Sequence, residues 1–299
     1  VGIGDFNRDG LPDIFLAGNQ VSSKLYLNKG GLHFEDVTVK AGLTTSSWCT
    51  GVSVVDINSD GWPDIYVCVS GRAPGERRKN LLFINQHDMT FREQAEAYGL
   101  ADTSYSTQAV FFDYDKDGRL DMYLLNHTLD DYHPNDIKDR KVDSNSIARD
   151  KLFHNEGVAP GMDHPFFQDV SGKAGIVEDG NGLGVVVSDV NGDGYPDVYV
   201  ANDYIRNDLL WLNNKDGSFT NCIASALRHQ SYSSMGTDAA DLNNDGRPDI
   251  MTLDMQPETN QRKKMMYSFL GEERRRLEVA KGYEPEYIHN MLQLNNGNR

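Results

Sequence analysis

The sequence predicts an all-β fold, and three observations lead to this prediction. An acidic nine-residue pattern, Asp-x-Asn/Asp-x-Asp-Gly-x-x-Asp, occurs five times, and its copies start 51, 57, 76 and 52 residues apart. Apolar runs of about five residues flank the copies, as β-strands do. The 299 residues include 28 Gly and 10 Pro, which is typical of many short elements joined by turns. A period of this length fits the four-stranded blade of a β-propeller.

Each repeat contains four predicted strands, in the order strand, acidic loop, strand, loop, strand, tight turn, strand. The first two flank the acidic pattern and are rich in β-branched and aromatic residues. The third strand ends on Asn, in residues 25–28, 82–85, 152–155, 210–213 and 292–295. The fourth strand begins at Phe34, Phe91, Phe167 and Phe219.

These units divide the chain into four complete blades and a partial fifth. We place the blades approximately at residues 1–46, 47–103, 104–180, 181–230 and 231–299, in a single propeller domain. The fifth unit stops after its third predicted strand, where the pattern expects one more. Because a propeller must close on itself or leave an exposed edge, this favours a fragment of a larger propeller, with five-bladed closure as the alternative.

The acidic loops are predicted to be calcium sites. Ca²⁺ takes six to eight oxygen ligands at roughly 2.3–2.6 Å. Positions 1, 3 and 5 offer Asp or Asn side chains, position 7 offers a backbone carbonyl, and Asp at position 9 closes the shell with both oxygens. Gly at position 6 permits the positive φ that turns the chain around the ion. The predicted ligands are Asp5, Asn7, Asp9, Leu11, Asp13, Asp56, Asn58, Asp60, Trp62, Asp64, Asp113, Asp115, Asp117, Arg119, Asp121, Asp189, Asn191, Asp193, Tyr195, Asp197, Asp241, Asn243, Asp245, Arg247 and Asp249.

An ordinary turn or an EF-hand fits these loops less well than a propeller calcium loop. A common Asp/Asn/Gly turn would account for one copy, but five copies in one register disfavour it. An EF-hand starts in the same way but needs Glu at position 12 and flanking helices. The loops contain sixteen carboxylates, which equals the formal net charge of −16. Since such clusters repel themselves without metal, we expect up to five Ca²⁺ ions that act as structural staples.

Composition and charge exclude further classes of protein. The net charge argues against nucleic acid as a partner. No apolar run reaches the ~18 residues that a membrane helix needs. The chain begins at Val1 with nothing that resembles a signal peptide, so we expect that processing or truncation removed the original N-terminus. Cys49, Cys68 and Cys222 are interpreted as three small buried residues, with a Cys49–Cys68 disulfide as the alternative.

At these motifs the sequence resembles the FG-GAP/VCBS repeats of integrin α-subunit propellers and of many secreted bacterial proteins. The acidic loop, the Leu-Tyr-Leu-Asn strand at residues 25–28 and the Phe-x-Asp-Val-Thr…Ala-Gly-Leu stretch at residues 34–43 carry the resemblance. Residues 234–258 and 290–296 resemble more narrowly the ASPIC/UnbV group, the cartilage acidic protein-like sequences. By resemblance to integrins, the ligand side is the face opposite the calcium loops. The ligand itself does not follow from the fold.

Topology places the connections between strands 2 and 3, and between blades, at the strand ends opposite the calcium loops. Two insertions open there, residues 126–150 and 254–290, and loops this long are usually functional or disordered; cover for the propeller is the alternative. Residues 263–281 allow a short amphipathic helix with a basic cluster at 274–276, which could also be a solvated helix face. The candidate partner-binding residues are Trp48, Arg72, Tyr105, Tyr132, His133, Tyr204, Arg206, His229 and Tyr232, and the aromatic ones could instead pack around a central channel.

The sequence favours a binding module over an enzyme. It contains no Gly-x-Ser-x-Gly, His-Glu-x-x-His or phosphate-binding glycine loop, and His87, His154 and His164 are expected at the surface. We expect a calcium-stabilised extracellular or cell-surface adhesion module that recognises a protein or glycan, because millimolar calcium suits such sites. The alternatives are a propeller-type polysaccharide lyase or hydrolase, and a passive spacer in a larger surface protein.

Overall fold

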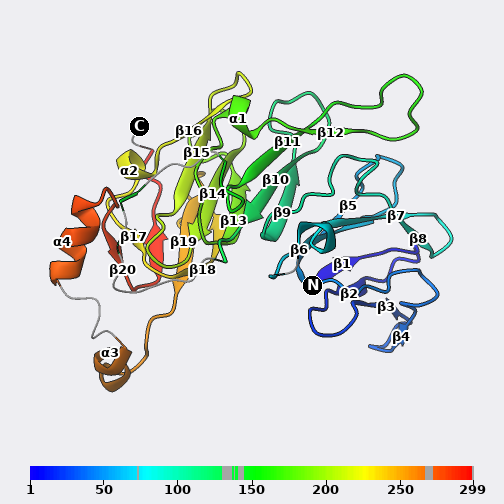
Figure 1. Cartoon of the computed structure of the whole chain (residues 1–299), viewed down its shortest axis with the longest axis horizontal. Helices are drawn as coiled ribbons and strands as arrows, with labels where there is room; N and C mark the ends of the chain where they lie inside the picture. The colour runs from blue at the N-terminus through cyan, green and yellow to red at the C-terminus, as the bar shows by residue number, and fades with distance from the viewer. Residues whose placement is uncertain (73, 130–136, 138, 141–144, 267–271, 298–299) are drawn as a thin grey trace. The chain divides into compact units, whose positions relative to one another are not determined.

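In a computed structural model of the chain, the described strands form five antiparallel sheets, one in each repeat, and a small parallel pair (Figure 1). The structure describes all residues except 73, 130–136, 138, 141–144, 267–271 and 298–299. Four sheets have four strands and the fifth has three, and in each the strands follow one another in chain order. The all-β prediction and the predicted order of strands within each repeat are therefore confirmed.

The first of two compact units holds three sheets and the 3₁₀ helix η1 (Gly75–Arg77). The first sheet consists of β1 (Gly2–Gly4), β2 (Asp13–Leu16), β3 (Lys24–Asn28) and β4 (Phe34–Asp36). The second consists of β5 (Cys49–Val55), β6 (Asp64–Val69), β7 (Leu81–Asn85) and β8 (Phe91–Glu93). The third consists of β9 (Ser106–Phe112), β10 (Asp121–Asn126), β11 (Lys151–Asn155) and β12 (Phe167–Asp169).

The second unit holds two sheets and the helices. The fourth sheet consists of β13 (Gly182–Ser188), β14 (Asp197–Asn202), β15 (Leu209–Asn213) and β16 (Phe219–Asn221). The fifth consists of β18 (Ser234–Ala240), β19 (Asp249–Asp254) and β21 (Met291–Gln293), and β17 (Gln230–Ser231) pairs in parallel with β20 (Glu286–Tyr287). The helices are α1 (Ser171–Ala174), α2 (Ile223–Ala226), α3 (Asn260–Met266) and α4 (Glu272–Ala280).

Within the first unit, neighbouring sheets stack face to face on apolar cores. Phe15 of the first sheet and Ile65 of the second belong to one buried cluster, and Leu82 of the second and Met122 of the third belong to another. Because side chains along a strand point alternately to the two faces, a sheet that is covered on both faces buries every residue of a strand. All six residues of β6 are buried in this way, which explains the unbroken run of apolar residues that follows Asp64 in this strand.

First strands of neighbouring sheets lie side by side. Thr50 and Ser53 of β5 donate hydroxyl hydrogen bonds to the carbonyls of Ser106 and Ala109 of β9, at 2.7 and 2.6 Å. A Cβ atom at Gly2 of β1 would lie 2.8 Å from the side chain of Val52, so glycine is required for this close approach. The first strands of successive sheets in this unit therefore approach each other closely.

The predicted amphipathic helix at residues 263–281 is only partly correct. The segment contains two helices, α3 and α4, and Phe269 and Leu270 lie outside the described residues. On α4, Leu277 is 44% exposed, whereas Glu278 is buried and pairs with the Arg274 guanidinium at 2.7 Å. Arg274 also donates to the Tyr232 hydroxyl at 3.1 Å. The Arg274–Glu278 ion pair lies within α4 on its buried side, and the hydrogen bond from Arg274 to Tyr232 joins that side of the helix to the segment after β17.

The cysteines are free thiols. Cys49 and Cys68 are buried and Cys222 is half-buried, so the alternative of a Cys49–Cys68 disulfide is not realised. Among the described residues, no helix is long and apolar enough to cross a bilayer.

Candidate calcium sites

The five acidic loops share one backbone conformation. Each joins the first and second strands of its sheet. Gly at position 6 has φ between 85° and 87° in all five, which confirms the predicted left-handed turn. The residue at position 4 is also left-handed, and this was not predicted because only one of the five is glycine. These residues are Arg8, Ser59, Lys116, Gly192 and Asn244, with φ of 57°, 59°, 64°, 71° and 59°.

The Asp at position 1 holds the loop in this conformation. Asp5 accepts the N–H of Asp9 through Oδ1 at 3.0 Å and the N–H of Gly10 through Oδ2 at 2.8 Å. The Asn7 side-chain oxygen accepts the same Asp9 N–H at 3.0 Å. The two bonds to position 1 recur in the second, fourth and fifth loops, at Asp56, Asp189 and Asp241. Side chains 1, 3 and 5 are thereby drawn together on the inside of the turn.

The Asp at position 9 is buried and ties the loop to the third strand. Asp64 is fully buried; its Oδ2 accepts the N–H of Ile57 at 3.1 Å, and its Oδ1 accepts that of Asn85 at 2.8 Å. The same pair of bonds forms at Asp13, Asp197 and Asp249. Each carboxylate oxygen has a further lone pair. Metal contact through both oxygens stays a prediction, as does the carbonyl contact at position 7.

The Asn that ends the third strand links loops of neighbouring sheets. The Asn85 side chain donates to the carbonyl of Phe6, in the first loop, at 3.0 Å. Asn295 likewise donates to the carbonyl of Val190, in the fourth loop, at 2.7 Å. In the first sheet, the Asn28 amide donates instead to a carbonyl of its own loop. The recurrent Asn therefore connects neighbouring acidic loops in the second, fourth and fifth sheets.

Burial makes three of the position-9 carboxyls, those of Asp13, Asp64 and Asp197, difficult to ionise without a cation. Burial, together with repulsion from the acids at positions 5 and 1, raises the pKa of Asp64 to about 7 and that of Asp197 to about 6. The same causes raise the pKa of Asp13. Backbone hydrogen bonds act in the opposite direction but do not cancel the effect. A bound divalent cation would supply the missing positive charge.

The position-5 carboxylates have cationic or polar neighbours at the loop surface. Burial alone would raise the pKa of Asp60, but hydrogen bonds from His87 and from the Trp62 N–H outweigh it and lower the pKa. His87 Nε2 lies 3.0 Å from Asp60 Oδ2, and Lys215 Nζ lies 3.3 Å from Asp193 Oδ2. These acids therefore remain ionised through the neutral range.

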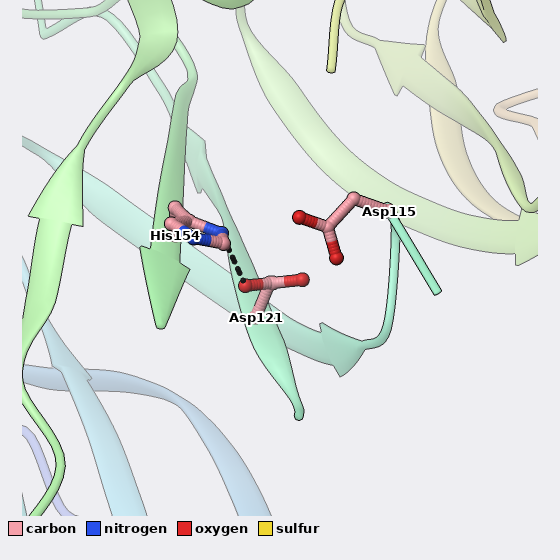
Figure 2. A group of neighbouring side chains, drawn as sticks. All are labelled: Asp115, Asp121 and His154. Carbon is pink, nitrogen blue, oxygen red and sulfur yellow. Dashed lines mark ion pairs between the residues drawn. The ribbon is translucent and has the colours of Figure 1, made fainter. Parts of the chain in front are cut away.

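The third loop brings together two groups of possible metal ligands. Ligand atoms of Asp113, Asp115 and Asp117 lie within 4.8 Å of one another, and so do those of Asp115, Asp121 and His154. Figure 2 shows His154, on β11, facing Asp121, with Nδ1 and Oδ1 3.2 Å apart. The expectation that His154 lies at the surface is wrong, because its side chain is only 18% exposed.

The donors of these loops fit calcium. The side chains at positions 1, 3, 5 and 9 offer oxygen, the ligand that hard cations such as Ca²⁺ prefer. The clusters carry three or four carboxylates each, enough to bind a divalent ion with charge to spare. Imidazole nitrogens lie beside the carboxylates of two loops, from His87 at Asp60 of the second loop and from His154 at Asp121 of the third.

At the opposite strand ends of the first unit, two candidate partner residues line one hollow. Trp48 and Arg72 face a space of about 590 Å³ formed by the segments after β2, before β5 and after β6. The Trp48 side chain is 47% exposed. Tyr132 and His133 lie outside the described residues.

Three further candidates are engaged in local contacts. Tyr105 is covered by the guanidinium of Arg78, whose carbon lies 4.2 Å from the ring centre. Arg206 pairs with Asp179 at 3.2 Å. Tyr204 occupies a left-handed turn with φ of 59°.

The last two candidates lie near the described part of the second insertion. Tyr232 is 4% exposed, and its hydroxyl accepts a hydrogen bond from α4, so its ring packs inside the protein. The ring of His229 meets that of Tyr287 edge-on, with centroids 5.8 Å apart. These contacts fit the alternative that the aromatic residues serve packing.

Comparison with protein families agrees with the loop geometry. The model described as "FG-GAP-like repeat" matches residues 5–67 and 189–252, which contain the first, second, fourth and fifth acidic loops. The chain carries FG-GAP-like repeats. The resemblance stated from the motifs is therefore confirmed.

Curated relatives of this FG-GAP-repeat chain include cartilage acidic protein 1 from two mammals. The Homo sapiens protein is 25% identical over 208 residues, which make up 67% of this chain and 29% of the relative. The Mus musculus protein is 24% identical over 208 residues, 67% of this chain and 30% of the relative. The chain thus spans less than a third of the length of these relatives.

Solved structures with a similar arrangement include a lectin and a matrix protein. An Agrocybe aegerita lectin, described as recognising non-reducing terminal N-acetylglucosamine, aligns with a TM-score of 0.44 at 17% identity, covering 84% of this chain and 60% of the lectin. The V. cholerae biofilm matrix protein Bap1 aligns with a TM-score of 0.39 at 13% identity, covering 83% and 33% of the two chains.

Proposed function

We propose that this chain forms part of a calcium-stabilised β-propeller, acting outside the cell or on its surface as a non-catalytic binding or adhesion module. The four-stranded antiparallel sheets have the form of propeller blades, and in the first unit the first strands of neighbouring sheets lie side by side. The observation that carries the proposal is the repetition of one acidic loop conformation at the same strand ends of five sheets. That repetition leaves the other strand ends for recognition.

Calcium is the cation that these loops fit best. Their clustered carboxylates include buried ones with raised pKa, such as Asp64 and Asp197, which a cation would stabilise in the ionised form. Calcium in the millimolar range occurs outside cells and suits loops of this kind. The relatives' name refers to cartilage, which also supports an extracellular setting.

The partner is a protein or a glycan bound at the strand ends opposite the acidic loops. In the first unit these ends carry an exposed Trp48 and a hollow of about 590 Å³, a volume within the range of about 300–1,000 Å³ that ligand pockets occupy. The net charge of −16 disfavours nucleic acid.

Three measurements on the purified chain test this function. Elemental analysis after gel filtration should find bound calcium, and arrays of glycans and matrix proteins should give binding in calcium that EDTA abolishes. Incubation with polysaccharides should give no new reducing ends or unsaturated sugars. Turnover would favour the lyase or hydrolase alternative, and a chain that binds calcium but no surface, protein or glycan would be a spacer.

A further inference from the structure

We propose that the hollow beside Trp48 binds an acidic sugar, one that carries a carboxylate or a sulfate ester; this inference rests on the proposed function. Two arginines, Arg72 and Arg77, line the hollow with Trp48. Among the described lining side chains there is no carboxylate. In a chain with a net charge of −16, two arginines beside one hollow favour an anionic ligand there.

Trp48 provides a flat surface for a sugar ring. Its indole is 47% exposed, although tryptophan is a residue that folded chains usually cover. Its carbonyl accepts the N–H of Ser70 at 3.0 Å, which fixes the backbone beneath the ring. Gly71 lies against the base of the indole, where an added Cβ would be 3.4 Å from Cγ, and its φ of 94° favours glycine at this turn. The C–H face of a pyranose packs on such a ring, and the amphipathic indole suits a ligand that is part apolar and part polar.

The remaining lining residues suit hydroxyl groups. Ser46, Ser47 and Ser70 offer hydroxyls that both donate and accept hydrogen bonds, and Asn19 offers an amide. A sugar presents several hydroxyls at once, whereas an acidic peptide presents mainly carboxylates and backbone amides. The combination of one aromatic surface, several small polar groups and two guanidinium groups therefore favours an acidic sugar over an acidic peptide.

The arginines of the segment after β6 have two roles: Arg78 holds the segment in place, and Arg72 and Arg77 line the hollow. Arg78 is 5% exposed, donates from Nε to the Thr103 carbonyl at 2.8 Å and lies over the Tyr105 ring. It anchors the segment that follows β6. Arg72 and Arg77 are exposed residues of the same segment and face the hollow. Guanidinium groups bind carboxylates and sulfates through two parallel hydrogen bonds, which gives both affinity and orientation.

The test is calorimetric titration of the whole chain in calcium buffer with matched sugar pairs. One pair is a hyaluronan tetrasaccharide and its methyl ester, and the other is a dextran sulfate oligosaccharide and unsulfated dextran. The acidic member of at least one pair should bind at least about tenfold more tightly than its neutral counterpart. Which pair responds shows whether the anion is a carboxylate or a sulfate.

The variants locate the binding. Trp48→Ala, and separately Arg77→Gln, should weaken binding of the acidic sugar by about tenfold or more, while Arg92→Gln, an exposed arginine on β8, should leave it unchanged. Unchanged melting temperatures for the three variants would show that the fold is intact. Equal binding of the acidic and neutral members in both pairs, full binding by Trp48→Ala and Arg77→Gln, or tighter binding of poly-glutamate than of either acidic sugar would overturn the inference.

These outcomes separate the inference from the proposed function. If the chain binds a neutral glycan or a protein, and the Trp48 and Arg77 variants retain that binding, the module stands and the acidic-sugar site does not. If the chain binds no glycan, protein or cell surface in calcium, both fail.

Discussion

Replacing Asp64 with Asn should change stability in opposite directions with and without calcium. Asn keeps the shape of the side chain and one acceptor oxygen. One of the two N–H groups now bonded to Asp64, from Ile57 and Asn85, would face an amide NH₂ instead of an acceptor. Loss of an acceptor for one buried N–H costs about 1–3 kcal/mol of unfolding free energy.

In EDTA at pH 8, the same substitution removes a buried charge. The pKa of Asp64 is about 7 in the folded chain, against 3.8 ordinarily, because burial and the neighbouring acids disfavour its ionised form. Once ionised, this carboxyl lowers the unfolding free energy by about 4 kcal/mol. The relief exceeds the cost of the lost hydrogen bond, so Asp64→Asn should stabilise the calcium-free chain by about 1–3 kcal/mol.

With calcium the balance reverses. The ion already compensates the carboxylate, so the substitution brings no relief and removes a charged ligand. Binding of an ion at a hundred times its Kd contributes about 2.7 kcal/mol, and the variant should lose most of this in addition to the hydrogen bond. Urea unfolding followed by circular dichroism, at pH 8 in EDTA and in millimolar calcium, measures both differences.

Asp208 supplies a matched control away from the acidic loops. Its carboxyl is buried, accepts hydrogen bonds from Asn202 N–H and the Tyr199 hydroxyl at 2.8 and 2.5 Å, and also has a pKa of about 7, raised by burial. Asp208→Asn should therefore have the same effect with and without calcium. If Asp64→Asn behaved in that way too, Asp64 would be a structural acceptor only and the metal assignment of its loop would be refuted.

Three further predictions follow from the same contacts. EDTA at neutral pH should lower the melting temperature of the native chain by several degrees, and calcium should restore it; calorimetry that shows no change would contradict the role of the ions. The pKa values of Asp64, Asp197 and Asp208 are raised in the folded chain, which therefore holds the protons of these carboxyl groups more tightly than the unfolded chain does. In EDTA, the free energy of unfolding should therefore fall as the pH rises from about 4 to about 7. Urea midpoints that rise across this range in EDTA would refute this. Asn85→Ala should lower the free energy of unfolding by about 2–4 kcal/mol, because it leaves a carbonyl of the neighbouring loop unbonded. Asn28→Ala should lower it by only about 1 kcal/mol, because Asn28 bonds within its own loop. Equal losses in chemical unfolding would show that the link between sheets contributes nothing.

The strands and loops could be predicted because their determinants lie within one repeat. Asp64 begins β6 and Asn85 ends β7, and the hydrogen bond between them explains why both recur at fixed places in every sheet. The left-handed turn at Gly61 follows from its lack of a side chain. The hollow could be foreseen only in part: the sequence places Trp48 and Arg72 at the correct strand ends, whereas Arg77 was missed because its position depends on η1.

The rest depends on contacts between distant segments. His154 occupies a third-strand position that is Leu or Ile in the other sheets, and this departure from the repeat is the signal that could have indicated its approach to Asp121. On α4, periodicity suggests that Leu277 would be covered, but the side that carries Arg274 and Glu278 is buried instead, and Arg274 bonds to Tyr232. A hydropathy pattern contains no information about such a pair.

Asn85 touches two acidic loops at once. Its backbone N–H bonds to Asp64, and its side chain bonds to the carbonyl of Phe6, whose own N–H bonds to Asp13. An ion that fixes Asp13 also fixes Phe6, and so orders the acceptor that holds Asn85 before an ion enters the second loop. Filling of adjacent loops should therefore be cooperative, so that the chain would switch between loose and rigid states over a narrower span of calcium concentration than independent sites would allow.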